Sequence, residues 1–162
     1  EYVRFPIIQV ASGPITDTTA PTLASSTPTD GATGVLPSAD IVLNFDENVA
    51  VGTGNISIVR TSDDLAQEID VTSGAVTVSG SQVTVNPGTD LDLNTAYHVL
   101  IGSTAIVDGA DTPTAFAGIR TNPVLNFTTL APPAIASSTP GSVSIIILRD
   151  IVFSYFILTI LF

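Results

Sequence analysis

The side chains with the clearest chemical potential are acidic groups placed in or beside expected turns. Asp90, Asp92 and Asn94 alternate along an extended stretch, so their oxygens can point the same way. Asp108 and Asp111 lie in a second acidic loop farther along the chain. Calcium takes about six to eight oxygen ligands from carboxylates, amides, carbonyls and water, so these five residues form a candidate calcium site. The alternative is a solvated acidic rim, since Asp and Asn favour turns.

Groups suited to catalysis are few. The chain has no cysteine, methionine or tryptophan, and its one histidine is His98. The absence of cysteine excludes disulfides and thiolate chemistry. His98 follows an inward-facing position of an expected strand, so alternation predicts that it points outward, with no nucleophile beside it. We therefore expect no enzymatic activity and no required cofactor, and a calcium ion is the one candidate ligand.

The charge balance restricts the partners. The 162 residues include 15 acidic and 4 basic side chains, which gives a net charge of −11. A surface this acidic repels phosphate backbones, which argues against nucleic acid as a partner. The apolar stretch 143–162 is interrupted by Arg149 and Asp150, and central charges are costly in a bilayer. Both observations argue for a protein that binds neither nucleic acid nor membrane.

Apolar residues alternate with period two between regularly spaced Pro and Gly residues, which predicts many short strands. A hairpin is expected across residues 79–81, with Val76 and Val78 facing Val83 and Val85. No long window has helical periodicity, and residues 62–69 would form a turn or two of helix at most. The pattern predicts an all-β, antiparallel β-sandwich. The expected inward rows are Ile41, Leu43 and Phe45; Ile56 and Ile58; Tyr97, Val99 and Ile101; and Leu125 and Phe127.

An internal repeat defines the expected domain organisation. The tetrapeptide Ser-Ser-Thr-Pro at 25–28 recurs at 137–140, and Asp-Ile-Val at 40–42 recurs at 150–152. We therefore expect one complete sandwich over residues 17–130. Residues 1–16 would be an extended N-terminal segment and linker. Residues 131–162 would hold a linker and the first strands of an incomplete second repeat, or a segment donated between subunits.

Three runs carry a family resemblance: DTTAP at 17–21, STPTDGATGV at 26–35 and DIVLNFDENV at 40–49. Together they resemble the opening of the bacterial Ig-like domains of the S-layer (SbsA) type, and LDLNTAYHV at 91–99 and NFTT at 126–129 resemble later strands of that family. One departure is DGADTP at 108–113, where the family often has Asp-x-x-Gly-Asn. The resemblance implies an Ig-like sandwich used in tandem in secreted bacterial surface proteins, without catalysis.

Three aromatic residues are expected to have structural roles. Phe45 and Phe127 lie in inward rows, and Tyr97 stands where Ig-like sandwiches often place a corner tyrosine whose hydroxyl bonds nearby backbone.

The leading functional expectation is a non-catalytic module of an extracellular, cell-surface fibre, stalk or lattice. An apolar leader and the apolar tail could pair with other copies by strand donation, giving head-to-tail homopolymers. The candidate assembly residues are Val3, Phe5 and Ile7 in the leader and Ile151, Phe153 and Tyr155 in the tail. Asp17 in the linker is a further calcium candidate if modules stack. The alternatives are an adhesin repeat that binds a glycan or protein on another surface, and an accessory domain of a larger surface hydrolase.

Overall fold

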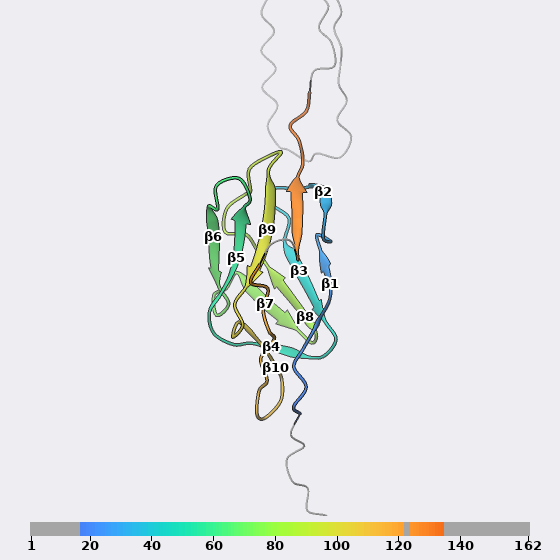
Figure 1. Cartoon of the computed structure of the whole chain (residues 1–162), viewed down its shortest axis with the longest axis vertical. Coiled ribbons are helices and arrows are strands. Elements are labelled where there is room, and N and C mark those ends of the chain that lie inside the picture. Colours follow the sequence, from blue (N-terminus) through green and yellow to red (C-terminus); the bar gives the residue numbers. More distant parts are fainter. Residues whose placement is uncertain (1–16, 122–123, 135–162) are drawn as a thin grey trace, which may run out of the picture. The chain divides into compact units, whose positions relative to one another are not determined.

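The computed structural model describes residues 17–121 and 124–134 (Figure 1). One compact unit extends to Pro132, and a second begins at Pro133, of which only two residues are described. The regular elements among the described residues of the first unit are all strands. They are β1 (Leu23–Thr27), β2 (Ala32–Val35), β3 (Ile41–Phe45), β4 (Val49–Val51), β5 (Asn55–Arg60), β6 (Ala66–Asp70), β7 (Val76–Ser79), β8 (Gln82–Val85), β9 (Ala96–Ile101), β10 (Ile106–Asp108) and β11 (Asn126–Thr129).

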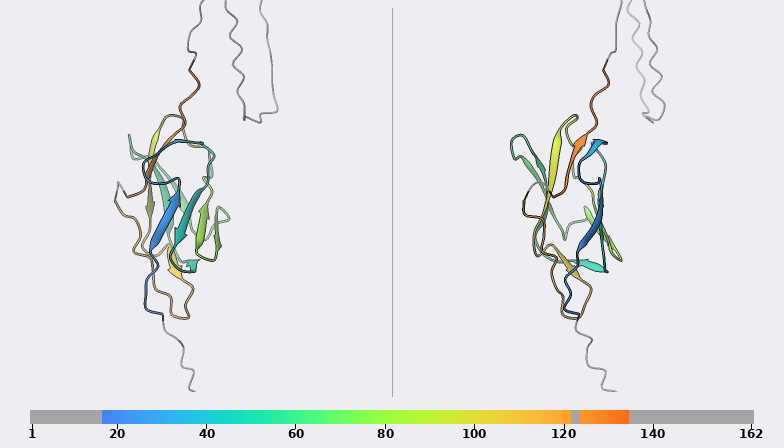
Figure 2. Two further views of the ribbon diagram at one scale, coloured as in Figure 1. Left: turned by 90° about the vertical axis from the view of Figure 1, so that its right-hand side faces the viewer. Right: turned by 45° about the vertical axis from the view of Figure 1, so that its right-hand side comes forward.

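Two sheets face each other across the core (Figure 2). One is four-stranded in the order β1-β3-β8-β7, and the other is five-stranded in the order β2-β11-β9-β5-β6. A short ribbon of β4 and β10 closes one end. The expected all-β Ig-like sandwich is confirmed. The pairing is antiparallel except between β11 and β2, which run parallel because β2 crosses from the sheet of β1 to the opposite sheet.

The expected inward rows form the core. Leu43 and Ile56 are completely buried, and Phe127 is 2% exposed. Phe45 packs edge-on against Phe116 with ring centroids 5.3 Å apart, and Tyr97 stacks on Phe127 at 5.9 Å. Every other residue of the expected rows is also buried: Ile41, Phe45, Ile58, Tyr97, Val99, Ile101 and Leu125.

The expected hairpin is present as β7 and β8. Val76 pairs with Val85 and Val78 with Val83, around a two-residue loop of Gly80 and Ser81. Gly80 has a φ of 61°, which suits a residue without a Cβ at the first loop position.

The segment 62–69 differs from the expectation of at most a helical turn or two. A turn at residues 61–63 is followed by β6, which pairs along its whole length with β5. Ile69 of β6 is buried, so cross-strand pairing and burial of this side chain override the weak local helical pattern.

The expectation that His98 points outward into solvent is wrong. His98 is only 7% exposed, and its strand partner Val59 is also buried. The His98 Nδ1 lies 3.3 Å from the hydroxyl of Thr61. Alternation predicts which face of a strand a side chain occupies, but it does not predict whether neighbouring segments cover that face.

The chain enters and leaves the sandwich at opposite ends. The segment leading to β1 begins beside the β4–β10 ribbon, whereas the segment after β11 departs from the other end (Figures 1 and 2).

None of the described residues forms a helix long and apolar enough to cross a membrane. The candidate assembly residues Val3, Phe5, Ile7, Ile151, Phe153 and Tyr155, like the expected leader and second repeat, lie outside the described residues.

Candidate functional site

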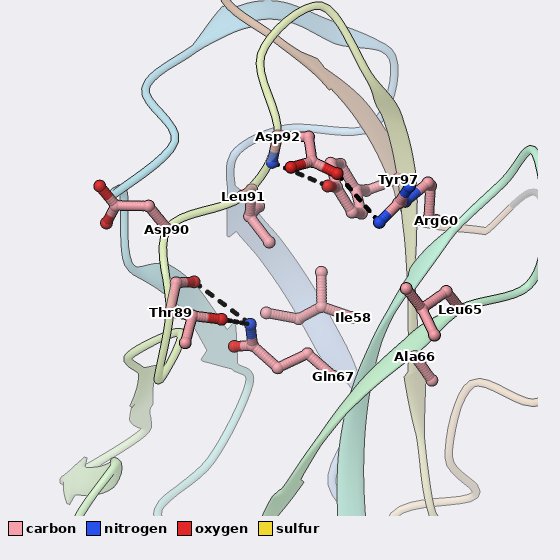
Figure 3. Close-up of a pocket in the computed structure, with 10 residues that line it drawn as sticks. All are labelled: Ile58, Arg60, Leu65, Ala66, Gln67, Thr89, Asp90, Leu91, Asp92 and Tyr97. Atoms are coloured by element: carbon pink, nitrogen blue, oxygen red, sulfur yellow. Dashed lines mark hydrogen bonds and ion pairs between the residues drawn. The ribbon is translucent and has the colours of Figure 1, made fainter.

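A cavity of ≈ 310 Å³ opens between β5, β6 and the loop that precedes β9 (Figure 3). Arg60 at the end of β5 spans its upper side, with a guanidinium nitrogen 2.9 Å from a carboxylate oxygen of Asp92. A second guanidinium nitrogen lies 3.5 Å from Asp63. The lining residues are Ile58, Arg60, Leu65, Ala66, Gln67, Thr89, Asp90, Leu91, Asp92 and Tyr97.

Hydrogen bonds hold the loop against the sheet around this cavity. The backbone N–H of Asp92 donates to the Tyr97 hydroxyl at 2.9 Å, a backbone contact of the kind expected of a corner tyrosine. The Gln67 amide donates to the carbonyl oxygen of Thr89 at 3.2 Å and to its hydroxyl at 2.6 Å. The position of the loop is therefore fixed from both β9 and β6 (Figure 3).

Two polar atoms of the cavity residues have no partner among the described residues. Arg60 Nε is a buried donor, and Gln67 Oε1 is a buried acceptor. The two atoms come from different parts of the lining, with Arg60 and Gln67 on separate sides of Ile58 (Figure 3). Leu65, which is 59% exposed, adds an apolar surface to the lining.

The five candidate calcium residues fall into two groups at opposite ends of the sandwich. Asp90, Asp92 and Asn94 lie in the loop before β9, where Asp92 is paired with Arg60 and the Asn94 N–H donates to the carbonyl of Leu130. Asp108 ends β10, and Asp111 lies exposed in the loop after it. The described part of the chain holds no group of three or more acidic, histidine or cysteine side chains already gathered as metal ligands. The fold thus does not bring the five residues together.

A different set of acids meets at the β4–β10 end. Asp46 accepts hydrogen bonds from the Thr22 hydroxyl at 2.6 Å and from the Thr22 backbone N–H at 2.8 Å, and these bonds lower the pKa of Asp46. For Glu47, desolvation raises the pKa, and the carboxylates of Asp17, Asp108 and Asp46 raise it further. The Asp-Glu pair at 46–47 reads in the sequence as an ordinary turn. The residues of β10 lie near this turn only because β4 pairs with β10. The local sequence pattern around residues 46–47 contains no indication of that pairing.

The sandwich with these end loops defines the chain as an Ig-like domain. The family model described as a bacterial Ig-like domain matches residues 17–129, and the chain belongs to this family. No curated protein matches the chain. Domains of this family are generally non-enzymatic structural modules, and they occur in bacterial surface proteins.

Proposed function

We propose that this chain is a structural module of a secreted, cell-surface fibre, stalk or lattice of the S-layer kind. The observation that carries the proposal is the exit of the chain from opposite ends of the sandwich (Figure 1). Modules joined through such ends lie in series, so that tension along the polymer passes through the fold.

The pairing of β2 with β11 suits this role. The two strands run parallel, so tension loads β2 from its N-terminal side and β11 from its C-terminal side. The bonds between them are then sheared together and not broken one at a time. Two further bonds flank the strand pair, from the Gly31 N–H to the Asn126 carbonyl at 2.8 Å and from the Leu130 N–H to the Val35 carbonyl at 2.7 Å.

An Asp side chain reinforces the same junction. The carboxylate of Asp30 accepts from the backbone N–H of Asn126 at 3.0 Å and from its side-chain amide at 2.8 Å. Asp30 belongs to the DGATGV run that precedes and forms β2. This motif therefore joins the first part of the domain to its last strand.

Assembly into homopolymers by strand donation is the more specific part of the proposal. Among the described residues, β6 pairs only with β5 and leaves its other edge open to an added strand. The alternating apolar residues Val3, Phe5 and Ile7 of another copy suit such an edge.

The test is the light-scattering mass of the full chain against a variant lacking residues 1–11. We expect the full chain to form polymers and the truncated chain to stay monomeric. As a control, Val3, Phe5 and Ile7 are changed to Ser in the full-length chain, which keeps the length and should also prevent assembly. Polymers of unchanged mass in both variants would contradict strand donation.

A second candidate function, an adhesin repeat, is favoured by the cavity beside β5 and β6, whose lining combines polar side chains such as Gln67 and Thr89 with apolar ones such as Leu65. Under this alternative, the cavity binds part of a glycan or a peptide. Screening the chain on a glycan array and repeating the screen with Gln67→Leu tests it. Hits that disappear in the variant would support adhesion, and an array without hits would favour the structural role.

A further inference from the structure

An apolar groove of ≈ 520 Å³ lies between β4 and β7, toward the end where the chain enters the sandwich (Figure 1). The Val49 N–H donates to the Gly80 carbonyl at 3.0 Å, which holds β4 beside the β7–β8 hairpin at one end of the groove. Val71 is completely covered, whereas Val51 is 39% exposed. The lining includes five valines: Val49, Val51, Val71, Val76 and Val78.

The edge of β4 that lines this groove has backbone groups left over for a further strand. On the other edge of β4, the Gly52 N–H donates to the Ala105 carbonyl at 2.8 Å, and Val51 lies opposite Ile106. In an antiparallel pair this register turns the N–H and C=O of Val51 away from β10. Among the described residues, these two groups of Val51 have no other backbone partner.

The open edge of β7 is in the same condition. The Asn86 N–H donates to the Ala75 carbonyl at 2.8 Å, and Val78 lies opposite Val83 of β8. This register turns the N–H and C=O of Val78 away from β8, and no other described residue bonds them through its backbone. Strand edges of this kind, above an apolar surface, accept an extended segment by β-augmentation.

The chain contains a segment whose sequence fits such a groove. Ile151, Phe153 and Tyr155 alternate with smaller side chains over residues 151–155, so a strand formed there would place three large side chains on one face. The same residues match β3 in the internal repeat, where Asp-Ile-Val at 40–42 recurs at 150–152. A β3-like pattern is suited to pairing between other strands.

Charge also favours this segment. Two of the acidic residues adjoin the groove, because Glu47 precedes its lining residue Asn48 and Asp70 precedes Val71. The chain as a whole has a net charge of −11. Within residues 143–162, by contrast, the side chains of one arginine and one aspartate cancel. This segment can therefore approach the acidic end without net repulsion.

The length of chain between the fold and this segment allows it to reach a neighbouring copy. The described residues end at Ala134, on the side of the sandwich opposite the groove. Residues 135–150 span up to about 50 Å when extended. In a head-to-tail series, the groove of the next copy lies ahead of this exit, whereas the chain must turn back along the sandwich to reach its own groove.

We propose that residues 151–155 of one copy add as a strand to the groove between β4 and β7 of the next copy. Ile151, Phe153 and Tyr155 then face the valines. This names a second contact of the proposed head-to-tail assembly and rests on that proposal. Since β4 has only three residues, the contact adds few backbone bonds and strengthens polymers that the leader contact forms.

The first test is site-directed cross-linking of full-length chains, which is clean because the chain has no cysteine. A chain with Thr72→Cys, exposed beside the groove, is mixed with a chain carrying Ser154→Cys and treated with a short bis-maleimide. We expect linked peptides that contain both cysteines, identified by mass spectrometry. The control replaces Thr72→Cys by Glu68→Cys, on exposed β6, and should give few such links.

Three outcomes of the cross-linking would overturn the proposal. The first is no link between the Thr72→Cys and Ser154→Cys chains. The second is an equal or larger yield with Glu68→Cys, which would place the segment on β6. The third is a link that forms only when one chain carries both Thr72→Cys and Ser154→Cys, which would mean that a chain fills its own groove.

The second test is the light-scattering mass of full-length Val51→Asp. Polymers should form only at about tenfold higher concentration than in the original chain, because the burial of one valine is lost. Val124→Asp, at a 55% exposed position outside the groove, is the matched control and should assemble like the original chain. Circular dichroism checks that both variants keep the fold.

The two proposals fail in different ways. Polymers that deletion of residues 1–11 abolishes but Val51→Asp leaves unchanged would refute the groove contact alone. A chain that cross-links from Ser154→Cys to Thr72→Cys yet never forms polymers would support the groove contact and refute the proposed polymer.

Discussion

The hydroxyl of Tyr97 and the backbone N–H of Asp92 are joined by a hydrogen bond of 2.9 Å across five residues of chain. This bond ties the loop before β9 to a buried aromatic ring that stacks on Phe127. The loop is therefore held by a core residue as well as by surface contacts.

Tyr97→Phe should keep the ring packing and lose this bond. We expect a loss of about 1–3 kcal/mol in the free energy of unfolding, since the Asp92 N–H is left without its acceptor. Urea denaturation measures the change. Asp92→Asn is the control, because it keeps the backbone N–H and weakens only the partly exposed pair with Arg60, at about 0–1 kcal/mol. A smaller loss in Tyr97→Phe than in Asp92→Asn would count against the role assigned to the hydroxyl.

Gly52, just after β4, lies where two backbone segments approach each other closely. A Cβ at this position would come within 2.1 Å of the carbonyl oxygen of Thr104, so Gly52→Ala forces the backbone to move. We expect a loss of about 1–3 kcal/mol, typical of overpacking, measured by thermal melting. Gly74→Ala is the matched control, because nothing lies within 4 Å of its added Cβ. Equal melting temperatures for the two variants would show that the β4–β5 turn tolerates the shift.

The Thr22–Asp46 contact predicts a dependence of stability on acid pH. The hydrogen bonds from Thr22 lower the pKa of Asp46 below its ordinary value of 3.8 in the folded state. The resulting stabilisation is fully present above the unfolded pKa and is lost as the pH falls through the folded pKa. Thr22→Val removes the hydroxyl, which is the larger cause, so acid unfolding should begin at a higher pH.

Circular dichroism along an acid titration measures this shift. Thr77→Val is the control, because it makes the same substitution at an exposed position of β7. This variant should unfold at the same pH as the original chain. Identical acid midpoints for Thr22→Val and the original chain would mean that Asp46 does not contribute to acid stability.

The alternation of apolar residues and the placement of turn residues were sufficient to predict much of the fold. The rows containing Leu43, Ile58 and Val99 follow from period two, and the β7–β8 hairpin follows from its short Gly-containing loop. The burial of His98 could not be predicted in this way, since it depends on what covers the outer face of β9. Nor could the parallel β2–β11 pair, which joins two ends of the domain.

The candidate sites were harder to predict for the same reason. Asp90 and Asp92 were expected to point the same way, but their side chains point apart, and only Asp92 turns toward Arg60 (Figure 3). The pairing of Asp92 with Arg60 depends on how a distant strand packs against their loop. Glu47 and Asp108 come together only because β4 pairs with β10. A single sequence contains no local signal for that pairing, so the acidic end could be found only in three dimensions.

The central claim, that the module carries tension from one end to the other, is tested most directly by pulling single full-length chains from their two termini. The Asp30 carboxylate reinforces the sheared β2–β11 pair. The Asp40 carboxylate accepts a hydrogen bond of 2.7 Å from the Asn86 side-chain amide, at a place outside that strand pair. We predict that Asp30→Ala lowers the unfolding force clearly more than Asp40→Ala. Equal forces in the original chain and both variants would contradict the claim.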